Sequence, residues 1–234
     1  MRRDLCAVIP AYQCEATIGA VVEGTRRHLA DVWVVDDGSS DATGEEALRA
    51  GARVERLEPN AGKGSALRHG LACALRENPA AVLLLDGDGQ HDPDDVPGFL
   101  DAWDRGAGDL IMGNRWGNLA VIPGARYWTN YIGSRILSWM TGRELVDSQS
   151  GYRLLSRDLV ERLRLRSRRY AIETEMLIKA AQAGARFAYV PVRTIYGEQG
   201  SHFRPVPDTF QIACAAIYYK VFDDGSGPAD DVAP

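Results

Sequence analysis

Short apolar runs alternate with amphipathic stretches along the first half of the chain. Five runs have the length and composition of β-strands: Leu5–Ile9, Val32–Val35, Arg53–Leu57, Val82–Leu85 and Leu110–Met112. Consecutive runs, apart from the last pair, are separated by a segment with helical periodicity. Residues 81–85 are apolar throughout, which is typical of a parallel strand buried on both faces. The pattern predicts an α/β fold with a mostly parallel central sheet flanked by helices, and with ligands at the carboxyl ends of the strands.

The pattern changes after about residue 115, where segments rich in Trp, Tyr and Arg begin. It predicts helices near Ser156–Leu165 and Ile172–Ala183, a strand near Phe187–Val190 and a last helix from Asp208. No linker or internal repeat marks a second domain, so we expect one domain over residues 1–222, with a change of character between 1–115 and 116–222. Residues 223–234 are mostly Asp, Gly, Pro and Ala and are expected to form a disordered tail.

The composition is that of a domain that folds in water. Of 234 residues, 45% are hydrophobic and 25% charged, which is enough for a substantial core. The 27 Lys and Arg against 32 Asp and Glu give a net charge of −5, which argues against a dedicated nucleic-acid binder. Four scattered cysteines form no C-x-x-C pair, and the longest apolar run, Ile212–Tyr219, is too short to cross a bilayer. We therefore expect a cytoplasmic protein with no membrane span.

The most informative motif is Asp86-Gly-Asp-Gly-Gln-His91, directly after the most apolar strand. Carboxylates at i and i+2 can point to the same side of a strand end, where they repel each other unless a hard cation such as Mg²⁺ or Mn²⁺ binds both. A calcium loop beginning at Asp86 would need Gly at its sixth position and Glu at its twelfth, where the chain has His91 and Pro97. The calcium interpretation therefore fails, and a plain Asp-Gly turn is the alternative that stays open.

A second motif, Gly62-Lys-Gly-Ser65, precedes a predicted helix. Gly64 occupies the place of the Ser or Thr that follows the lysine of a P-loop, and Leu67 replaces the third glycine of a dinucleotide fingerprint. The ATPase and NAD interpretations therefore lose support. Lys63 near a helix start is suited to a diphosphate contact, and a solvated loop lysine is the alternative.

Four motifs together resemble the family 2 glycosyltransferases of the GT-A fold, a Rossmann-like nucleotide-diphospho-sugar transferase fold. They are Val8-Ile-Pro-Ala-Tyr12 with Glu15, Val34-Val-Asp-Asp-Gly-Ser-Ser-Asp41, Asn60-Ala-Gly-Lys-Gly64 and Asp86-Gly-Asp-Gly-Gln-His91. The Gln-His extension, with Asp147-Ser-Gln-Ser-Gly-Tyr-Arg153, is similar more specifically to the polyprenyl-phosphate and dolichyl-phosphate sugar transferase branch. The similarity covers about residues 5–205.

The resemblance implies a role for each matching residue. The nucleoside of a sugar-nucleotide donor would be held by Pro10, Tyr12, Glu15 and Asp37, with Asp36 adjacent. The donor phosphates would lie at Lys63 and Arg115, and the metal, Mg²⁺ or Mn²⁺, would be surrounded by Asp86, Asp88 and Gln90. The acceptor side is matched by Asp147, Gln149 and Arg153, and a solvated charge is the alternative for Arg153.

The implied reaction is a metal-dependent, inverting transfer of a hexose, of the mannose or glucose type, from a GDP- or UDP-sugar to a polyprenyl phosphate. A lipid phosphate oxygen is already an anion at neutral pH, so positioning matters more than a strong general base. We expect the catalytic contributions from Asp88, Arg115 and Asp147. A family 2 transferase with a saccharide acceptor and a non-catalytic sugar-nucleotide-binding module stay open as alternatives.

Residues 116–139 contain three of the five tryptophans. Trp128, Ile132, Ile136 and Trp139 recur at steps of three and four residues, the spacing of one helix face. Such a helix can lie in the headgroup plane of a membrane, and from periodicity alone core packing or a dimer face is the alternative. A lipid-linked acceptor favours the membrane, so we expect a protein peripheral to the inner face of the cell membrane.

Two later segments contain further charged residues. Related transferases carry a mobile loop that closes over the donor phosphates in the region of Gly197–Arg204, so the resemblance implies phosphate or metal contacts for Ser201, His202 and Arg204. Glu173 and Glu175 open a predicted helix, where acidic residues are favourable without any function. We expect no part for these two glutamates in the site.

Overall fold

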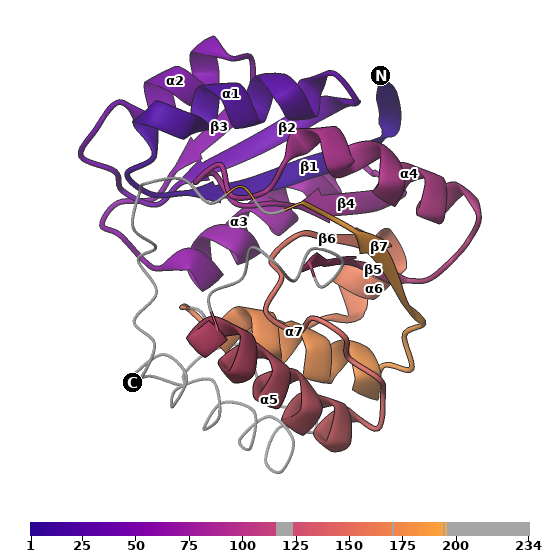
Figure 1. Ribbon diagram of the computed structural model, residues 1–234. Helices are drawn as coiled ribbons and strands as arrows, with labels where there is room; N and C mark the ends of the chain where they lie inside the picture. Colours follow the sequence, from indigo (N-terminus) through magenta and orange to yellow (C-terminus); the bar gives the residue numbers. More distant parts are fainter. Residues whose placement is uncertain (116–123, 170, 194, 196–234) are drawn as a thin grey trace.

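A seven-stranded sheet forms the centre of the computed structural model, which describes residues 1–115, 124–169, 171–193 and 195 and only the backbone of 124–132 (Figure 1). Its strands are β1 (Arg2–Ala11), β2 (Leu29–Asp36), β3 (Arg53–Arg56), β4 (Ala81–Leu84), β5 (Leu110–Asn114), β6 (Arg153–Ser156) and β7 (Phe187–Pro191). Their order is β3-β2-β1-β4-β6-β5-β7, and all neighbours pair in parallel except β6, which is antiparallel to β4 and β5. The predicted α/β fold with a mostly parallel sheet is confirmed.

Helices cover both faces of this sheet (Figure 1). They are α1 (Glu15–Arg26), α2 (Thr43–Arg49), α3 (Lys63–Arg76), the 3₁₀ turn η1 (Pro93–Asp95), α4 (Val96–Asp104), α5 (Gly124–Thr141), α6 (Arg157–Arg162) and α7 (Ala171–Gln182). Successive side chains of a strand point to opposite faces. In β1, Ile9 accordingly belongs to the core under α1 with Ile18, and Val8 to the core under α3 with Leu71.

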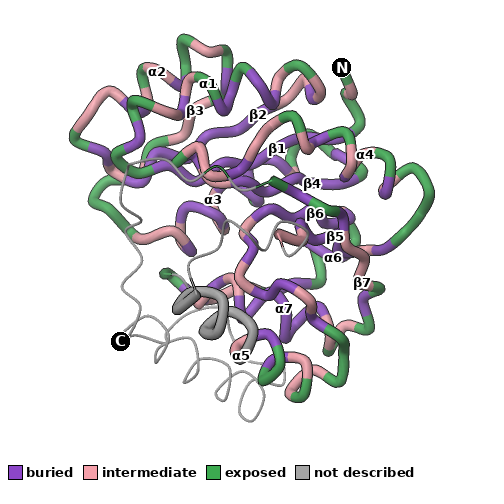
Figure 2. Tube along the Cα trace, viewed as in Figure 1, coloured by how far each residue is buried: buried purple, intermediate pink, exposed green. Residues whose placement is uncertain are grey.

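Burial is concentrated in the strands. Figure 2 shows buried residues along the central strands and exposed residues along the loops and the outer turns of the helices. In β4 all four residues are buried, as expected for a strand covered on both faces. Among the helices that the structure describes, none is both long enough and apolar enough to cross a lipid bilayer.

The sequence pattern did not predict β6. This strand has four residues and begins with the charged residue Arg153, so it is too short to show a period of its own. It lies between β4 and β5, where Leu154 pairs with Leu83 and Ile111. The predicted helix from Asp208 and the predicted tail 223–234 lie outside the described residues.

The helix predicted over Ser156–Leu165 ends earlier, as α6, at Arg162. The backbone that follows is bound by a side chain of α7. The carboxylate of Glu175 accepts the amide N–H groups of Arg166 and Ser167, at 2.8 Å each. Glu175 also forms an ion pair of 2.8 Å with Lys179, and Lys179 in turn donates to the carbonyl of Arg164. This network ties residues 164–167 to α7.

The same segment passes very close to the start of α3. A Cβ atom added to Gly62 would lie 2.5 Å from the carbonyl oxygen of Arg168, and one added to Gly64 would lie 2.7 Å from the carbonyl carbon of the same residue. Gly62 also has φ = +91°, a conformation that favours glycine. The glycines on either side of Lys63 are therefore required by contact between two backbones.

We predict that Gly64→Ala destabilises the fold by about 1–3 kcal/mol, because the added methyl group meets backbone atoms that cannot move aside. The control is Gly19→Ala on α1, where nothing lies within 4 Å of the added atom. That change should stabilise the protein by about 0.5–1 kcal/mol through the higher helix propensity of alanine. Urea unfolding of both variants measures the difference, and equal stabilities would contradict the close contact.

Candidate active site

The acidic loop, residues 86–91, follows β4 at the carboxyl edge of the sheet. It is fixed to α1 by the hydroxyl of Thr17, which donates to the carbonyl of Gly87 at 2.7 Å. A Cβ on Gly87 would come within 3.1 Å of side-chain atoms of Cys14 and Ile18, so the loop packs closely on this helix. The position of the loop agrees with the prediction of a ligand site at the strand ends.

Lys63, the first residue of α3, joins two carboxylates from distant parts of the chain. Its Nζ lies 2.8 Å from Oδ1 of Asp86 and 2.6 Å from Oε1 of Glu173 on α7. None of the three side chains is more than 25% exposed. Burial opposes the charged forms, but the attraction between these groups is stronger: it raises the pKa of Lys63 and lowers the pKa of Asp86. Lys63 and Asp86 are therefore held in the charged state.

Asp88 is more exposed than Asp86. Its Oδ1 accepts the backbone N–H of Gln90 at 3.0 Å. Partial removal from water, and then the negative charge of Asp86, raise the pKa of Asp88. The repulsion between the two carboxylates is thus incompletely relieved by Lys63. Carboxylate and amide oxygens are the ligands that Mg²⁺ and Mn²⁺ prefer, so the residues of this loop fit such an ion.

Residues 147–153 pack against the acidic loop. A Cβ on Gly151 would lie 3.0 Å from Oδ2 of Asp86 and 3.4 Å from Nε2 of His91. His91 is buried, and its Nε2 lies 3.5 Å from Oδ2 of Asp86. The ring of His91 lies beside that of Tyr152, with centroids 4.9 Å apart. The motif predicted to serve the acceptor is therefore in direct contact with the motif predicted to hold the metal.

Arg153 is only 1% exposed. Its guanidinium donates to three backbone carbonyls, those of Ser148, Ser150 and Glu173, at 2.8–3.0 Å. This corrects the alternative of a solvated charge for Arg153, and its role on the acceptor side stays a prediction. The side chain ties residues 148–150 to the start of α7.

Arg115 and Asp147 form a bidentate ion pair, in which two N–H groups of the guanidinium donate to the two carboxylate oxygens. Nε of Arg115 lies 2.7 Å from Oδ2 of Asp147, and Nη2 lies 2.8 Å from Oδ1. The Asp147 side chain is buried, whereas that of Arg115 is 19% exposed. Gln149, two residues along, is half-buried. The two residues expected to act on the phosphates and the acceptor are thus joined to each other.

The residues expected around the nucleoside lie at the ends of β1 and β2. The carboxylate of Asp37 accepts the backbone N–H groups of Ala61 and Gly62, at 2.8 Å each, and so shapes the loop before Lys63. Asp36 is buried and paired with Arg56 at 3.2 Å. Pro10 is buried at the end of β1, and Tyr12 is 41% exposed. Glu15 is exposed and accepts the N–H of Ala42 at 2.9 Å.

The described chain ends beside the acidic loop. The backbone N–H of Ile195 donates to the carbonyl of Gln90 at 3.1 Å. Just before it, Arg193 is paired with Asp95 at 2.9 Å and with Asp92 at 3.2 Å. Ser201, His202 and Arg204 lie outside the described residues.

Sequence reasoning missed Glu173, which was expected to have no part in the site. An acidic residue in the first turn of a helix is favourable wherever the helix lies, so nothing local distinguishes Glu173 from Glu175. The difference lies in the packing: Glu173 meets Lys63, and Glu175 binds backbone amides.

Comparison with known proteins identifies the family. Residues 6–164 match the model of glycosyl transferase family 2. The chain belongs to glycosyltransferase family 2. It is 30% identical over 208 residues to the undecaprenyl-phosphate mannosyltransferase of Micrococcus luteus, and the match covers 82% of this chain and 84% of that protein. It is 31% identical over 215 residues to the UDP-N-acetylglucosamine–dolichyl-phosphate N-acetylglucosaminyltransferase of Methanococcus voltae, with coverage of 82% and 85%.

The fold of this family 2 glycosyltransferase is also found among crystal structures. The structure of glucosyl-3-phosphoglycerate synthase from Mycobacterium tuberculosis in complex with Mn²⁺, uridine diphosphate and phosphoglyceric acid is similar, with a TM-score of 0.74 and 22% sequence identity. The match covers 95% of this chain and 80% of that chain. At this identity the likeness concerns the fold alone, and it confirms the GT-A fold expected from the sequence motifs.

We predict that two substitutions on α7, two positions apart, affect different properties of the glycosyltransferase: the first mainly sugar transfer and the second mainly stability. Glu173→Gln removes a charge partner of Lys63, and hydrogen bonds to charged groups contribute about 1.5–3 kcal/mol. The free energy of unfolding should fall by no more than this amount, since Asp86 still pairs with Lys63, and cleavage of the bond between sugar and nucleotide should slow about tenfold or more.

The matched variant, Glu175→Gln, removes a buried charge that faces Lys179 and two backbone amides. It should lower the free energy of unfolding by about 3–5 kcal/mol. Urea unfolding and nucleotide release are measured on both variants. An equal loss of stability in both would contradict the assignment of Glu173 to the site.

Proposed function

We propose that the protein is a metal-dependent, inverting polyprenyl-phosphate hexosyltransferase that uses a GDP- or UDP-sugar of the mannose or glucose type. The observation that carries the proposal is the grouping of Asp86, Asp88 and Lys63 at the carboxyl end of β4. The relative from Micrococcus luteus, similar over most of its length, is named for mannosyl transfer to undecaprenyl phosphate. The grouping supports sugar-nucleotide chemistry, and the relative supports the class of acceptor.

Asp86, Asp88 and Gln90 would hold Mg²⁺ or Mn²⁺ with oxygen ligands, and the related structure that contains Mn²⁺ and uridine diphosphate supports this choice of ion. When bound, such an ion stabilises the negative charge that grows on the departing diphosphate. Lys63 adds a second positive charge beside the same carboxylates. Asp86 and Glu173 keep the lysine protonated, which is the state that a diphosphate contact needs.

The acceptor phosphate supplies its own nucleophile. One of its anionic oxygens attacks the anomeric carbon as the bond from that carbon to the diphosphate oxygen breaks, and the configuration at the carbon inverts. No proton has to be removed from the acceptor, so no general base is required. The protein's part is to position two anions that repel each other. Arg115, held in place by Asp147, is suited to that task because its guanidinium carries a permanent positive charge.

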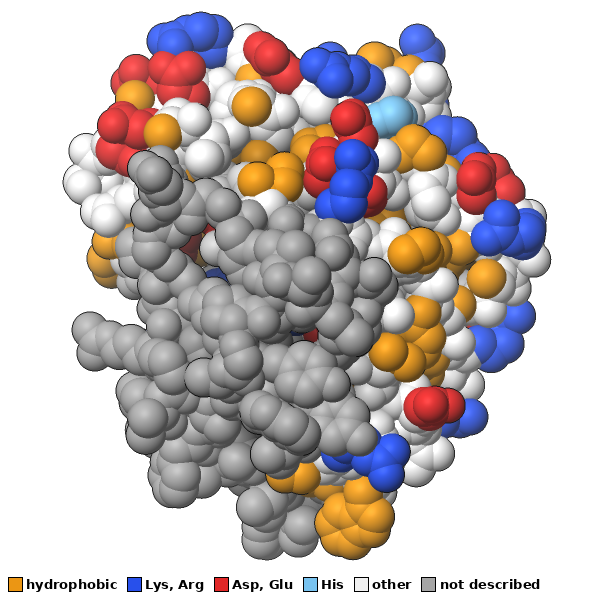
Figure 3. Space-filling view, in the orientation of Figure 1, with side chains coloured by type: hydrophobic (Ala, Val, Ile, Leu, Met, Phe, Trp, Pro, Cys, Tyr) orange, Lys and Arg blue, Asp and Glu red, His pale blue; other side chains and the backbone are white. Residues whose placement is uncertain are grey.

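The described half of α5 supports contact with a membrane. Ser134 and Leu137 are buried, whereas Ile136 is 52% and Trp139 80% exposed. Hydrophobic side chains appear at the lower edge of the face in Figure 3, where Figure 1 draws the C-terminal end of α5. An exposed tryptophan next to an aliphatic residue is typical of a surface that enters the headgroup region of a bilayer. We infer that the enzyme is peripheral to the inner membrane face and meets its lipid acceptor there.

We predict that Asp88→Ala lowers metal-dependent sugar transfer at least about a hundredfold, because the ion stabilises the transition state by several kcal/mol. Its fold should be unchanged, since the exposed Asp88 side chain accepts one backbone bond. The assay supplies a panel of nucleotide sugars, Mg²⁺ or Mn²⁺ and a short polyprenyl phosphate, and detects the glycolipid by mass. Asp101→Ala, which removes an exposed carboxylate of α4, is the control. Near-normal transfer by Asp88→Ala would overturn the metal assignment.

A separate prediction concerns the membrane. Ile136→Ser with Trp139→Ser should reduce cosedimentation with liposomes that contain polyprenyl phosphate several-fold, because burying these side chains in lipid contributes about 1.5–3 kcal/mol each. The control is Leu48→Ser on α2. It removes a different hydrophobic side chain, which is 64% exposed, and should have no effect on cosedimentation. If the double variant sediments with liposomes as well as the wild type, α5 is not the membrane contact.

A further inference from the structure

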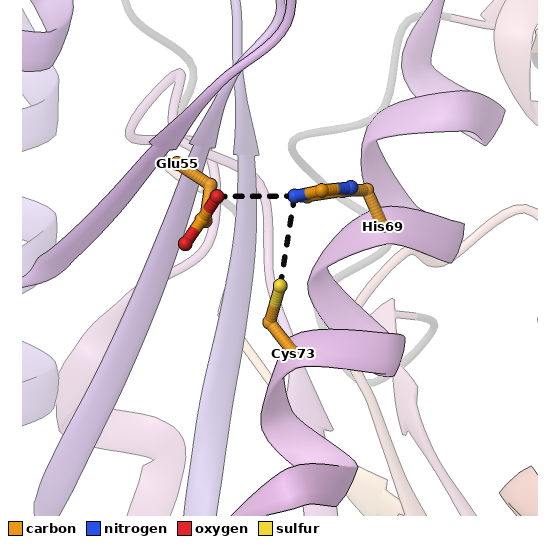
Figure 4. A group of neighbouring side chains, drawn as sticks. All are labelled: Glu55, His69 and Cys73. Atoms are coloured by element: carbon orange, nitrogen blue, oxygen red, sulfur yellow. Dashed lines mark hydrogen bonds and ion pairs between the residues drawn. The ribbon is translucent and has the colours of Figure 1, made fainter.

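A second group of metal-binding side chains lies away from the acidic loop. Glu55 is on β3, and His69 and Cys73 are one turn apart on the face of α3 that meets this strand (Figure 4). Nε2 of His69 lies 3.2 Å from Oε2 of Glu55 and 3.5 Å from Sγ of Cys73. The three ligand atoms all lie within 4.8 Å of one another.

We propose that Glu55, His69 and Cys73 bind a Zn²⁺ ion, at a site separate from that of sugar transfer. Zn²⁺ accepts thiolate, imidazole and carboxylate ligands together, whereas Mg²⁺ and Mn²⁺ prefer oxygen. The nitrogen and sulfur donors of this group therefore select a different ion from the carboxylates of the acidic loop. Three protein ligands leave a fourth position of a tetrahedral ion for water.

The distances suit a tetrahedral ion. Bonds of about 2.05 Å to nitrogen and oxygen and about 2.3 Å to sulfur place neighbouring ligand atoms roughly 3.3–3.6 Å apart in a tetrahedron. The two distances from His69 Nε2, 3.2 and 3.5 Å, are close to these edges. The remaining edge, between Glu55 and Cys73, is at most 4.8 Å and would shorten by a rotation of the Glu55 side chain, which is 41% exposed.

The surroundings allow an ion to reach the site. The side chains of His69 and Glu55 are 38% and 41% exposed, so an ion can approach them from solvent. Cys73 is buried, and burial together with the charge of Glu55 raises the pKa of the thiol. The ion itself must therefore displace the thiol proton, as metal ions do when they bind cysteine.

Binding would connect β3 to the middle of α3. The first residue of α3 is Lys63, so an ion at this site would restrain the helix that carries a central residue of the acidic group. The proposal does not depend on the proposed sugar transfer, since its ligands and its ion are different.

Cadmium tests the proposal directly, because a thiolate bound to Cd²⁺ absorbs in the near ultraviolet. Full-length protein freed of metal by a chelator is titrated with Cd²⁺ and then with Zn²⁺, with no donor present. We expect one equivalent of the thiolate band in the wild type, displaced by Zn²⁺. The band should be lost in Cys73→Ala and require at least tenfold more metal in His69→Ala.

Two variants serve as controls. Cys6→Ala removes another buried thiol, on β1, and Asp88→Asn changes the acidic loop, so both should keep the band. Circular dichroism checks the folding of each variant. His69 is partly exposed, so His69→Ala decides the matter if Cys73→Ala does not fold. Absence of a stoichiometric band in the wild type, its persistence in Cys73→Ala, or an unchanged metal requirement in His69→Ala would overturn the proposal.

Discussion

The ion pairs of Lys63 are the interaction on which the arrangement of the site depends. One ammonium group lies between a carboxylate from the end of β4 and another from α7, residues more than eighty positions apart in the chain. Without Lys63, Asp86 and Glu173 would be two poorly hydrated charges of the same sign. With it, the end of the central strand and the starts of α3 and α7 meet at one positive charge that lies between two negative ones, and this attraction holds the three elements together.

That centre needs close support from the backbone. Lys63 can lie between the two carboxylates because α3 starts against residues 167–169, and Gly62 and Gly64 permit this approach. Glu175 holds the start of this stretch by binding the amides of Arg166 and Ser167. A lysine is thus positioned by glycines on its own helix and by a glutamate that it never touches. Stability and site geometry are linked here, because residues 167–169 pack against the start of α3 and thereby also fix Lys63.

The sequence was sufficient where function depends on short motifs and fold depends on periodicity. Continuous apolar runs identified the parallel strands, and the Asp86–His91 motif identified the edge of the sheet where carboxylates gather. The sequence was insufficient where a role depends on a distant partner. Glu173 and Glu175 stand two positions apart on one helix and differ only in what packs against each. Arg153 has the charge of a substrate ligand, but it is buried because it begins β6, a short strand that the sequence pattern did not predict.

The direction of β6 has a consequence for how such a site can be assembled. Arg153 at its beginning pairs with Leu84 at the end of β4 and with Met112 near the end of β5. A parallel strand in this place would bring its preceding loop to the opposite edge of the sheet. Because β6 is reversed, the loop that leads into it, with Asp147 and Gln149, arrives at the edge where the other strands finish. Because this one strand is antiparallel, the loop before β6 and the acidic loop after β4 lie at the same edge of the sheet, although they are far apart in the sequence.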